Sequence, residues 1–120
     1  MRSLDLQTFS YEDRTSVLSE LTNSFAECGG WVLDRRTLSP NLTQFHIELQ
    51  LRSVVDLYAA LISAGIELTR AAHLGLTDLC TCRKHVATID LGQVVSLRIE
   101  INFLEDVTLH SLLATLCPPA

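Results

Sequence analysis

Hydrophobic positions along the chain change their period several times, and each change marks a boundary between predicted elements. Residues 3–9 alternate as a strand does, with Leu4 and Leu6 on one face. The next segment follows helical spacing, and its apolar stripe consists of Val17, Leu18, Leu21, Phe25 and Cys28. Asp13 is expected to cap this helix, because its carboxylate can accept bonds from free amides of the first turn. Gly29-Gly30 is expected to end it.

The middle of the chain predicts a β-hairpin followed by a second helix. Residues 31–39 read as a strand, and Pro40-Asn41 makes the turn. The next strand alternates strictly, with its apolar side formed by Thr43, Phe45, Ile47, Leu49 and Leu51. Ser53 is expected to open the second helix, with Asp56 placed as in a capping box and Gly65 at the end. Its predicted stripe is Val54, Val55, Tyr58, Leu61 and Ile62.

The remainder predicts two further strands and a short terminal helix. Residues 66–76 read as a strand, less cleanly patterned. A very regular strand follows at residues 94–105, and its inward side consists of Val95, Leu97, Ile99, Ile101 and Phe103. The last helix has a stripe of Leu109, Leu112, Leu113 and Leu116 and is ended by Pro118-Pro119. The long strands near the C-terminus are expected to offer an edge for self-pairing.

The order of these elements predicts an α+β protein with a ferredoxin-like βαββαβ arrangement. Its antiparallel sheet would carry two helices on one face, with a C-terminal extra strand and short helix added. The chain reads as a single domain, 1–120, with a core at 3–76 and an extension at 77–120. The opposite sheet face would be polar, lined by His46, Glu48, Gln50, Arg98, Glu100 and Asn102. One alternative function is therefore a small enzyme that uses this face as a cleft.

The segment "LSELTNSFAECGGWVLDRRTLSPNLTQFHIELQL" resembles the first helix and central hairpin of an ACT domain. The matching positions are Leu18, Leu21, Phe25, Ala26 and Gly29-Gly30 in the helix and turn, and Phe45, Ile47 and Leu49 in the third strand. The resemblance implies a small regulatory module that binds amino acids or similar effectors and pairs sheets edge to edge. It places the effector-binding residues at Asp13, Arg14, Thr15, Gly29 and Gly30. A homodimer or higher homo-oligomer is the implied assembly.

Composition and charge narrow the function classes. The chain has 120 residues and a formal net charge of -5, which argues against binding nucleic acid through phosphate neutralisation. It contains no apolar run of roughly 18 residues that could span a bilayer, and its N-terminus lacks the pattern of a signal peptide. We therefore expect a cytoplasmic protein that has no membrane partner and whose cysteines stay reduced.

A second alternative is a metal-binding or metal-sensing protein centred on the segment "LCTCRKH". If this segment is extended, Cys80 and Cys82 point to one side, and His85 and His73 could complete a tetrahedral zinc site. The competing interpretation is a connecting segment with two packed thiols, because structural zinc sites use wider cysteine spacings. No cofactor is expected unless this segment holds zinc.

Few other residues suggest chemistry. The pair Arg35-Arg36 could grip a carboxylate through two parallel hydrogen bonds, or could serve only the solubility of the surface. No G-x-S-x-G, P-loop or G-x-G-x-x-G sequence occurs. The sequence therefore favours a non-catalytic regulatory module that binds a small effector and self-associates.

Overall fold

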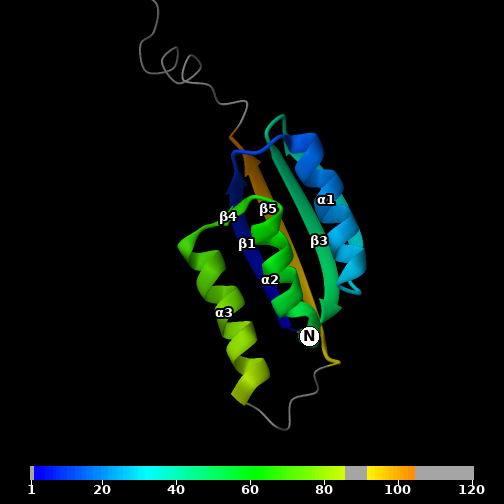
Figure 1. The fold of residues 1–120 in the computed structure, drawn as a ribbon, viewed down its shortest axis with the longest axis vertical. Coiled ribbons are helices and arrows are strands. Elements are labelled where there is room, and N and C mark those ends of the chain that lie inside the picture. The colour runs from blue at the N-terminus through cyan, green and yellow to red at the C-terminus, as the bar shows by residue number, and fades with distance from the viewer. Residues whose placement is uncertain (1, 86–91, 105–120) are drawn as a thin grey trace, which may run out of the picture.

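A computed structural model describes the backbone of residues 2–85 and 92–104, with side chains from 3–79 and 92–104. The chain forms five strands and three helices in this part, with one short 3-10 turn (Figure 1). In chain order they are β1 (Arg2–Ser10), α1 (Arg14–Glu27), β2 (Trp31–Ser39), β3 (Leu42–Gln50), η1 (Leu51–Ser53), α2 (Val54–Ser63), β4 (Ile66–Leu68), α3 (Arg70–His85) and β5 (Val94–Phe103).

The five strands form one mixed sheet in the order β2-β3-β5-β1-β4. β5 runs parallel to β1 and antiparallel to β3, and it pairs with each of them along almost its whole length. The predicted α+β class is confirmed, but a ferredoxin-like strand order is not, because β5 separates β3 from β1. The stretch assigned to an extension beyond residue 76 thus supplies the middle strand of the sheet.

The central position of β5 overturns the expectation that a C-terminal strand offers the free edge. Both of its backbone edges are used in ladders, so β5 has no unpaired row of amides and carbonyls. In the described part of the chain the outer strands are β2 and the three-residue β4. β2 is therefore the long edge strand of this protein.

The hydrophobic core lies between the sheet and its three helices, which pack side by side on one face (Figure 1). The predicted inward residues of β3 and β5 are buried, with Phe45, Ile47, Ile99 and Phe103 at most 1% exposed. The predicted stripe of α1 is buried as well, at Val17, Leu18, Leu21 and Phe25. The alternating sequence pattern therefore predicted correctly which face of the sheet is covered.

Local signals at the ends of α1 act as the sequence predicts. Asp13 caps the helix, since its Oδ2 accepts hydrogen bonds from the backbone N–H of Ser16 at 3.1 Å and from the Ser16 hydroxyl at 2.9 Å. Gly29 takes a positive φ of 75° just beyond the helix, and Gly65 takes 85° beyond α2. Glycine accepts this left-handed conformation without a Cβ penalty.

The predicted strand over residues 66–76 is wrong for most of its length. Strand β4 ends at Leu68, and the chain then turns into α3. The Thr69 hydroxyl accepts a hydrogen bond from the backbone N–H of Ala72 at 3.2 Å, as a helix cap does. Ala72, Leu76 and Leu79 are buried at helical spacing. Polar and small residues separate these three positions, so the sequence pattern did not reveal the apolar stripe.

The start of α2 also differs from the prediction. Ser53 occupies the N-cap position, but its side chain makes no capping hydrogen bond, because the preceding residues already coil as a 3-10 turn. The buried residues of α2 are Val54, Leu57 and Leu61. Val55 and Ile62, both assigned to the buried stripe, are 38% and 49% exposed.

Two further observations bear on the remaining expectations. No helix in the described part of the chain is both long enough and apolar enough to cross a membrane. The predicted terminal helix with Leu109, Leu112, Leu113 and Leu116 lies outside the described residues.

Candidate functional site

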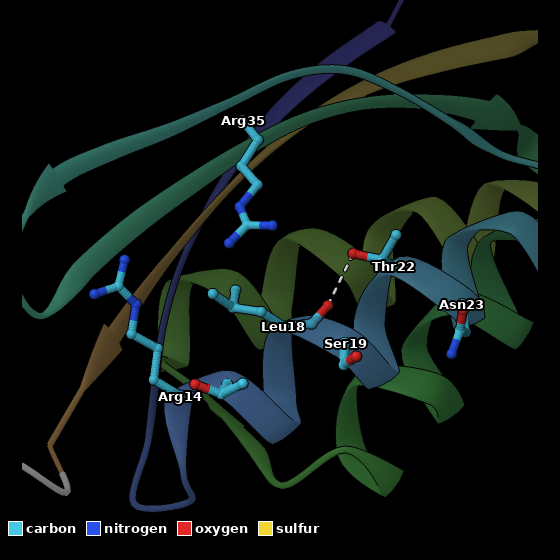
Figure 2. Close-up of a pocket in the computed structure, with 7 residues that line it drawn as sticks. Arg14, Leu18, Ser19, Thr22, Asn23 and Arg35 are labelled. Carbon is cyan, nitrogen blue, oxygen red and sulfur yellow. Dashed lines mark hydrogen bonds between the residues drawn. The ribbon is translucent and has the colours of Figure 1, made fainter.

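A groove of about 500 Å³ runs between α1 and the edge strand β2 (Figure 2). Phe25 of α1 packs against Phe45 of β3, whereas every residue of β2 except Ser39 is exposed. The groove is lined by polar side chains of α1, one leucine and one residue of β2: Arg14, Thr15, Leu18, Ser19, Thr22, Asn23 and Arg35.

Arg35 forms the strand wall of this groove. It is the β2 partner of Phe45, and because paired residues of an antiparallel ladder share a side, it faces the helices. Its guanidinium carbon lies 5.8 Å from the centre of the Phe45 ring. Figure 2 shows the side chain reaching from the strand toward α1. Among the described residues no carboxylate or carbonyl accepts a hydrogen bond from Arg35, so its donors face the groove.

Arg14 stands at the opposite end of the groove, at the first residue of α1. Its Nη1 donates to the backbone carbonyl of Pro40 at 2.8 Å, and its Nη2 lies 3.4 Å from the Thr37 hydroxyl. These bonds tie the start of α1 to the β2–β3 hairpin. A guanidinium has five N–H donors, so those not used in these bonds stay available to a ligand.

The α1 wall of the groove consists of hydroxyl and amide side chains. Thr15, Ser19 and Asn23 recur every four residues, which places them in one row along the helix. The Thr22 hydroxyl donates to the Leu18 carbonyl at 2.8 Å, and its lone pairs remain free to accept. None of the described residues that line the groove carries a carboxylate, although the whole chain has a net charge of -5. The two guanidinium groups can therefore bind a small anion, and the hydroxyl and amide side chains can form hydrogen bonds with other polar groups of the same ligand.

The structure divides the predicted effector-binding residues. Arg14 and Thr15 line the groove, while the Asp13 carboxylate is engaged in capping α1. Gly29 and Gly30 lie at the other end of the helix, which has 14 residues and is thus about 21 Å long. There a Cβ on Gly30 would come within 3.2 Å of the Glu48 carbonyl oxygen, so this glycine serves close packing against β3.

The pair Arg35-Arg36, identified in the sequence as a possible carboxylate contact, is split between two faces. Arg35 faces the groove, whereas Arg36 is on the opposite face and its Nε lies 2.7 Å from Asp34 Oδ2. The helix residues Ser19, Thr22 and Asn23 were not predicted to belong to a site. The only signal that could have indicated these three residues is that they are polar and lie on the uncovered side of α1.

The residues proposed for a metal site lie on α3, which is helical and not extended up to His85. The argument that Cys80 and Cys82 point to one side as in a strand therefore fails. His73 is exposed, and its Nδ1 lies 2.9 Å from the Tyr58 hydroxyl. Within the described residues no three metal-ligating side chains gather, and the side chains of Cys80, Cys82 and His85 lie outside those residues.

The polar sheet face carries the residues considered for an enzyme. His46 Nε2 lies 2.7 Å from the Ser96 hydroxyl, and Gln44 Nε2 lies 3.2 Å from Glu100 Oε1. A histidine base normally needs a third group that orients its ring. Among the described residues no carboxylate hydrogen-bonds to His46.

Cys28 lies in a separate depression between α1 and α2. Burial raises the pKa of its thiol, and the nearby carboxylates of Asp56 and Glu27 raise it further. Because the thiolate is the reactive form of cysteine, this environment suppresses reactivity.

Comparisons of the chain with protein-family models, with curated proteins and with solved structures found no match. Among the sites above, the groove between α1 and β2 has space for a ligand. Its charged side chains are both arginines, and they keep N–H donors that no described residue uses.

Proposed function

We propose that this protein is a non-catalytic, ACT-like regulatory module that binds a small carboxylate of amino-acid type and self-associates. The observation that carries the proposal is the pair of guanidinium groups, Arg14 and Arg35, at one groove whose described lining includes no acidic side chain. The alternation of strand, helix, strand, strand, helix and strand through β4 also supports the ACT-like interpretation, with β5 as an insertion between β3 and β1.

The groove fits a ligand of this size and charge. Its volume of about 500 Å³ lies within the range of known small-molecule sites. Arg35 can meet a carboxylate with two parallel hydrogen bonds, which fixes both position and orientation. The row of Thr15, Ser19 and Asn23 offers donors and acceptors for an amino or hydroxyl group on the same ligand.

A stability assay with a ligand panel tests the binding claim. The panel contains the common amino acids, small mono- and dicarboxylates, and inorganic phosphate. A ligand present at about one hundred times its Kd raises the unfolding free energy by about 2.7 kcal/mol, which is easily measured. Arg35→Gln should reduce the stabilisation by at least about 1.4 kcal/mol, which corresponds to a tenfold loss of affinity, and Arg36→Gln, which changes the same charge on the other face, should preserve it. Equal loss in both variants, or no stabilising compound, would reject the groove as the site.

The proposed self-association uses the outer edge of β2. This nine-residue strand pairs only with β3 in the described part of the chain, and it exposes several large apolar side chains. Trp31, Leu33 and Leu38 are each 48% exposed. An unpaired strand edge with exposed apolar side chains favours addition of another strand.

The charges of β2 select a register for two antiparallel copies. Directly opposed residues share a face of the sheet, and Asp34 and Arg35 face opposite sides, so a two-fold axis perpendicular to the sheet must pass between the two copies of one residue. An axis between the two copies of Arg35 sets Asp34 of each copy opposite Arg36 of the other. The exposed pair that these residues form within one chain would then become two pairs between chains.

The same register brings the Arg35 side chains of the two copies face to face on the helix side. Like charges directly opposite each other destabilise a strand pair. An anion held in the grooves would relieve this repulsion, so ligand binding and self-association should strengthen each other.

Charge exchange tests the register by sedimentation equilibrium. Asp34→Arg should weaken the dimer because it sets arginine opposite arginine. Adding Arg36→Asp should restore the dimer, since the pairs between chains return with their signs reversed. A monomeric wild type up to high concentration, or a double variant as weak as the single one, would reject pairing in this register.

A further inference from the structure

A second groove, of about 550 Å³, lies on the sheet face opposite the helices, where β1 and β5 end and β3 begins. Phe9 and Leu42 each lie beside Asn102 of β5 in the sheet, so these residues form one row across three strands. Tyr11 and Leu104, just beyond the ends of β1 and β5, complete the apolar part of the described lining. This end of the groove is therefore a platform of apolar side chains.

The two aromatic rings of this platform are only partly packed. The Phe9 and Tyr11 rings meet edge to face, with centroids 6.0 Å apart. Tyr11 nevertheless remains 63% exposed, the largest fraction of any large hydrophobic side chain in the described residues. The face of an aromatic ring attracts both apolar groups and cations, the latter through the negative charge of its π-electrons. The platform thus offers contact area to a ligand that has an apolar body and a positive charge.

Glu100 supplies the only charge of the described lining. It occupies the next row of the sheet, between Gln7 of β1 and Gln44 of β3. The Gln44 side-chain amide donates to Glu100 Oε1 at 3.2 Å, which orients the carboxylate and leaves Oε2 without a hydrogen bond from any described residue. No basic side chain of the described residues forms an ion pair with Glu100. The carboxylate can therefore bind a positively charged group.

The next basic residue along β5 does not cancel this charge. Arg98 lies one row farther from the apolar platform and directly beside Asp5 of β1 in the sheet. Opposite charges at directly paired positions offset each other. Arg98 is also absent from the lining of the groove, and it lines a smaller neighbouring depression together with Asp5. The charge that faces the groove is thus that of Glu100.

We propose that this groove binds a small organic cation, a primary amine with an aromatic body. Neighbouring rows on one face of a sheet are about 7 Å apart, because each row is two strand residues from the next. The ammonium group donates to the Glu100 carboxylate, while the aromatic body lies one row away against Phe9 and Tyr11. This site is independent of the proposed anion site, since the two grooves lie on opposite faces of the sheet and carry opposite charges.

Titration with 2-phenylethylamine, followed by two-dimensional NMR of isotope-labelled protein, tests the proposal. We expect saturable shifts at the amides of Phe9, Glu100 and Asn102. Two compounds serve as controls. The first, 3-phenylpropionate, has the same aromatic body with a carboxylate in place of the amine, and it should leave these three amides unchanged because Glu100 repels it. The second, butylamine, keeps the ammonium group but lacks the ring, and it should bind more weakly.

Three variants locate the interaction. Glu100→Gln removes the charge at almost constant size and should weaken the apparent affinity for 2-phenylethylamine at least about tenfold. Glu48→Gln removes the same charge two rows away on the same face and should preserve the affinity. Tyr11→Ala should weaken it about two- to fivefold.

The dispersion of the NMR spectrum shows that each variant is folded. Equal affinity of Glu100→Gln and wild type would overturn the proposal. So would binding of 3-phenylpropionate at the same three amides with similar affinity, or shifts that spread over acidic residues of the whole surface and do not saturate.

Discussion

The central position of β5 makes a quantitative prediction for Ile99→Ala. Ile99 is fully buried and lies between Leu6 of β1 and Phe45 of β3 in the sheet. The substitution removes three carbons, worth about 2.4 kcal/mol at ~0.8 kcal/mol each, and leaves a cavity that adds to the loss. We therefore expect the unfolding free energy to fall by about 3 kcal/mol, a large share of the roughly 5–15 kcal/mol typical of a domain.

Urea unfolding followed by circular dichroism measures this loss, and Arg98→Ala provides the matched control. Arg98 is the adjacent residue of the same strand but is exposed on the other face, so its replacement should cost less than about 0.5 kcal/mol. In a thermal scan the Ile99 variant should melt about 10 °C lower than wild type. A loss below about 1 kcal/mol for Ile99→Ala would mean that β5 is a peripheral addition, and would refute its central position in the sheet.

Three further predictions concern local features. Asp13→Ala should cost about 1 kcal/mol in urea unfolding because α1 loses its cap, whereas Asp13→Asn should cost less because the amide oxygen still accepts; equal losses would contradict the capping role. Gly29→Ala should lower the unfolding free energy by about 1–2 kcal/mol, because alanine is strained at the positive φ of this position; a Cβ would meet no neighbouring atom, so no clash adds to this loss. Gly29→Asn should lower it less. Equal stability of the wild type and both variants would show that the turn is not held left-handed. Alkylation of Cys28, followed by peptide mass spectrometry, should rise with pH only above the range where an unfolded cysteine titrates, because burial, Asp56 and Glu27 all raise the pKa of its thiol; identical pH midpoints in folded and unfolded protein would contradict this environment.

The sequence predicted well where one periodicity was unambiguous. Strict alternation identified the buried side of β3 and β5, and the caps identified the ends of α1. It failed for residues 66–76, where the short β4 gives way to a helix whose apolar residues are widely spaced. It also could not place β5, because an alternating strand has the same pattern at the edge of a one-sided sheet as at its centre.

The candidate site was only partly predictable for a related reason. Arg14 and Thr15 entered the predicted site through the resemblance, and Arg35 as one of a pair of arginines in a predicted strand, but their convergence depends on how α1 crosses the sheet. This crossing leaves β2 exposed, and no local sequence pattern encodes the crossing. The resemblance also placed Gly29-Gly30 in the site, but the length of α1 separates these glycines from Arg14.

Titration of isotope-labelled protein by two-dimensional NMR tests the central claim most directly, because it locates the ligand as well as detecting it. With the carboxylate that stabilises the protein best, we predict saturable shifts at the amides of Thr15, Ser19 and Thr22 and at the Arg35 side-chain Nε–H, with the amides of Asp5 and Arg98 at the polar sheet face unchanged. Arg35→Gln should weaken the apparent affinity at least about tenfold, the loss expected for one charge-assisted hydrogen bond. Shifts centred on the polar sheet face, or unchanged affinity in Arg35→Gln, would contradict the groove between α1 and β2 as the binding site.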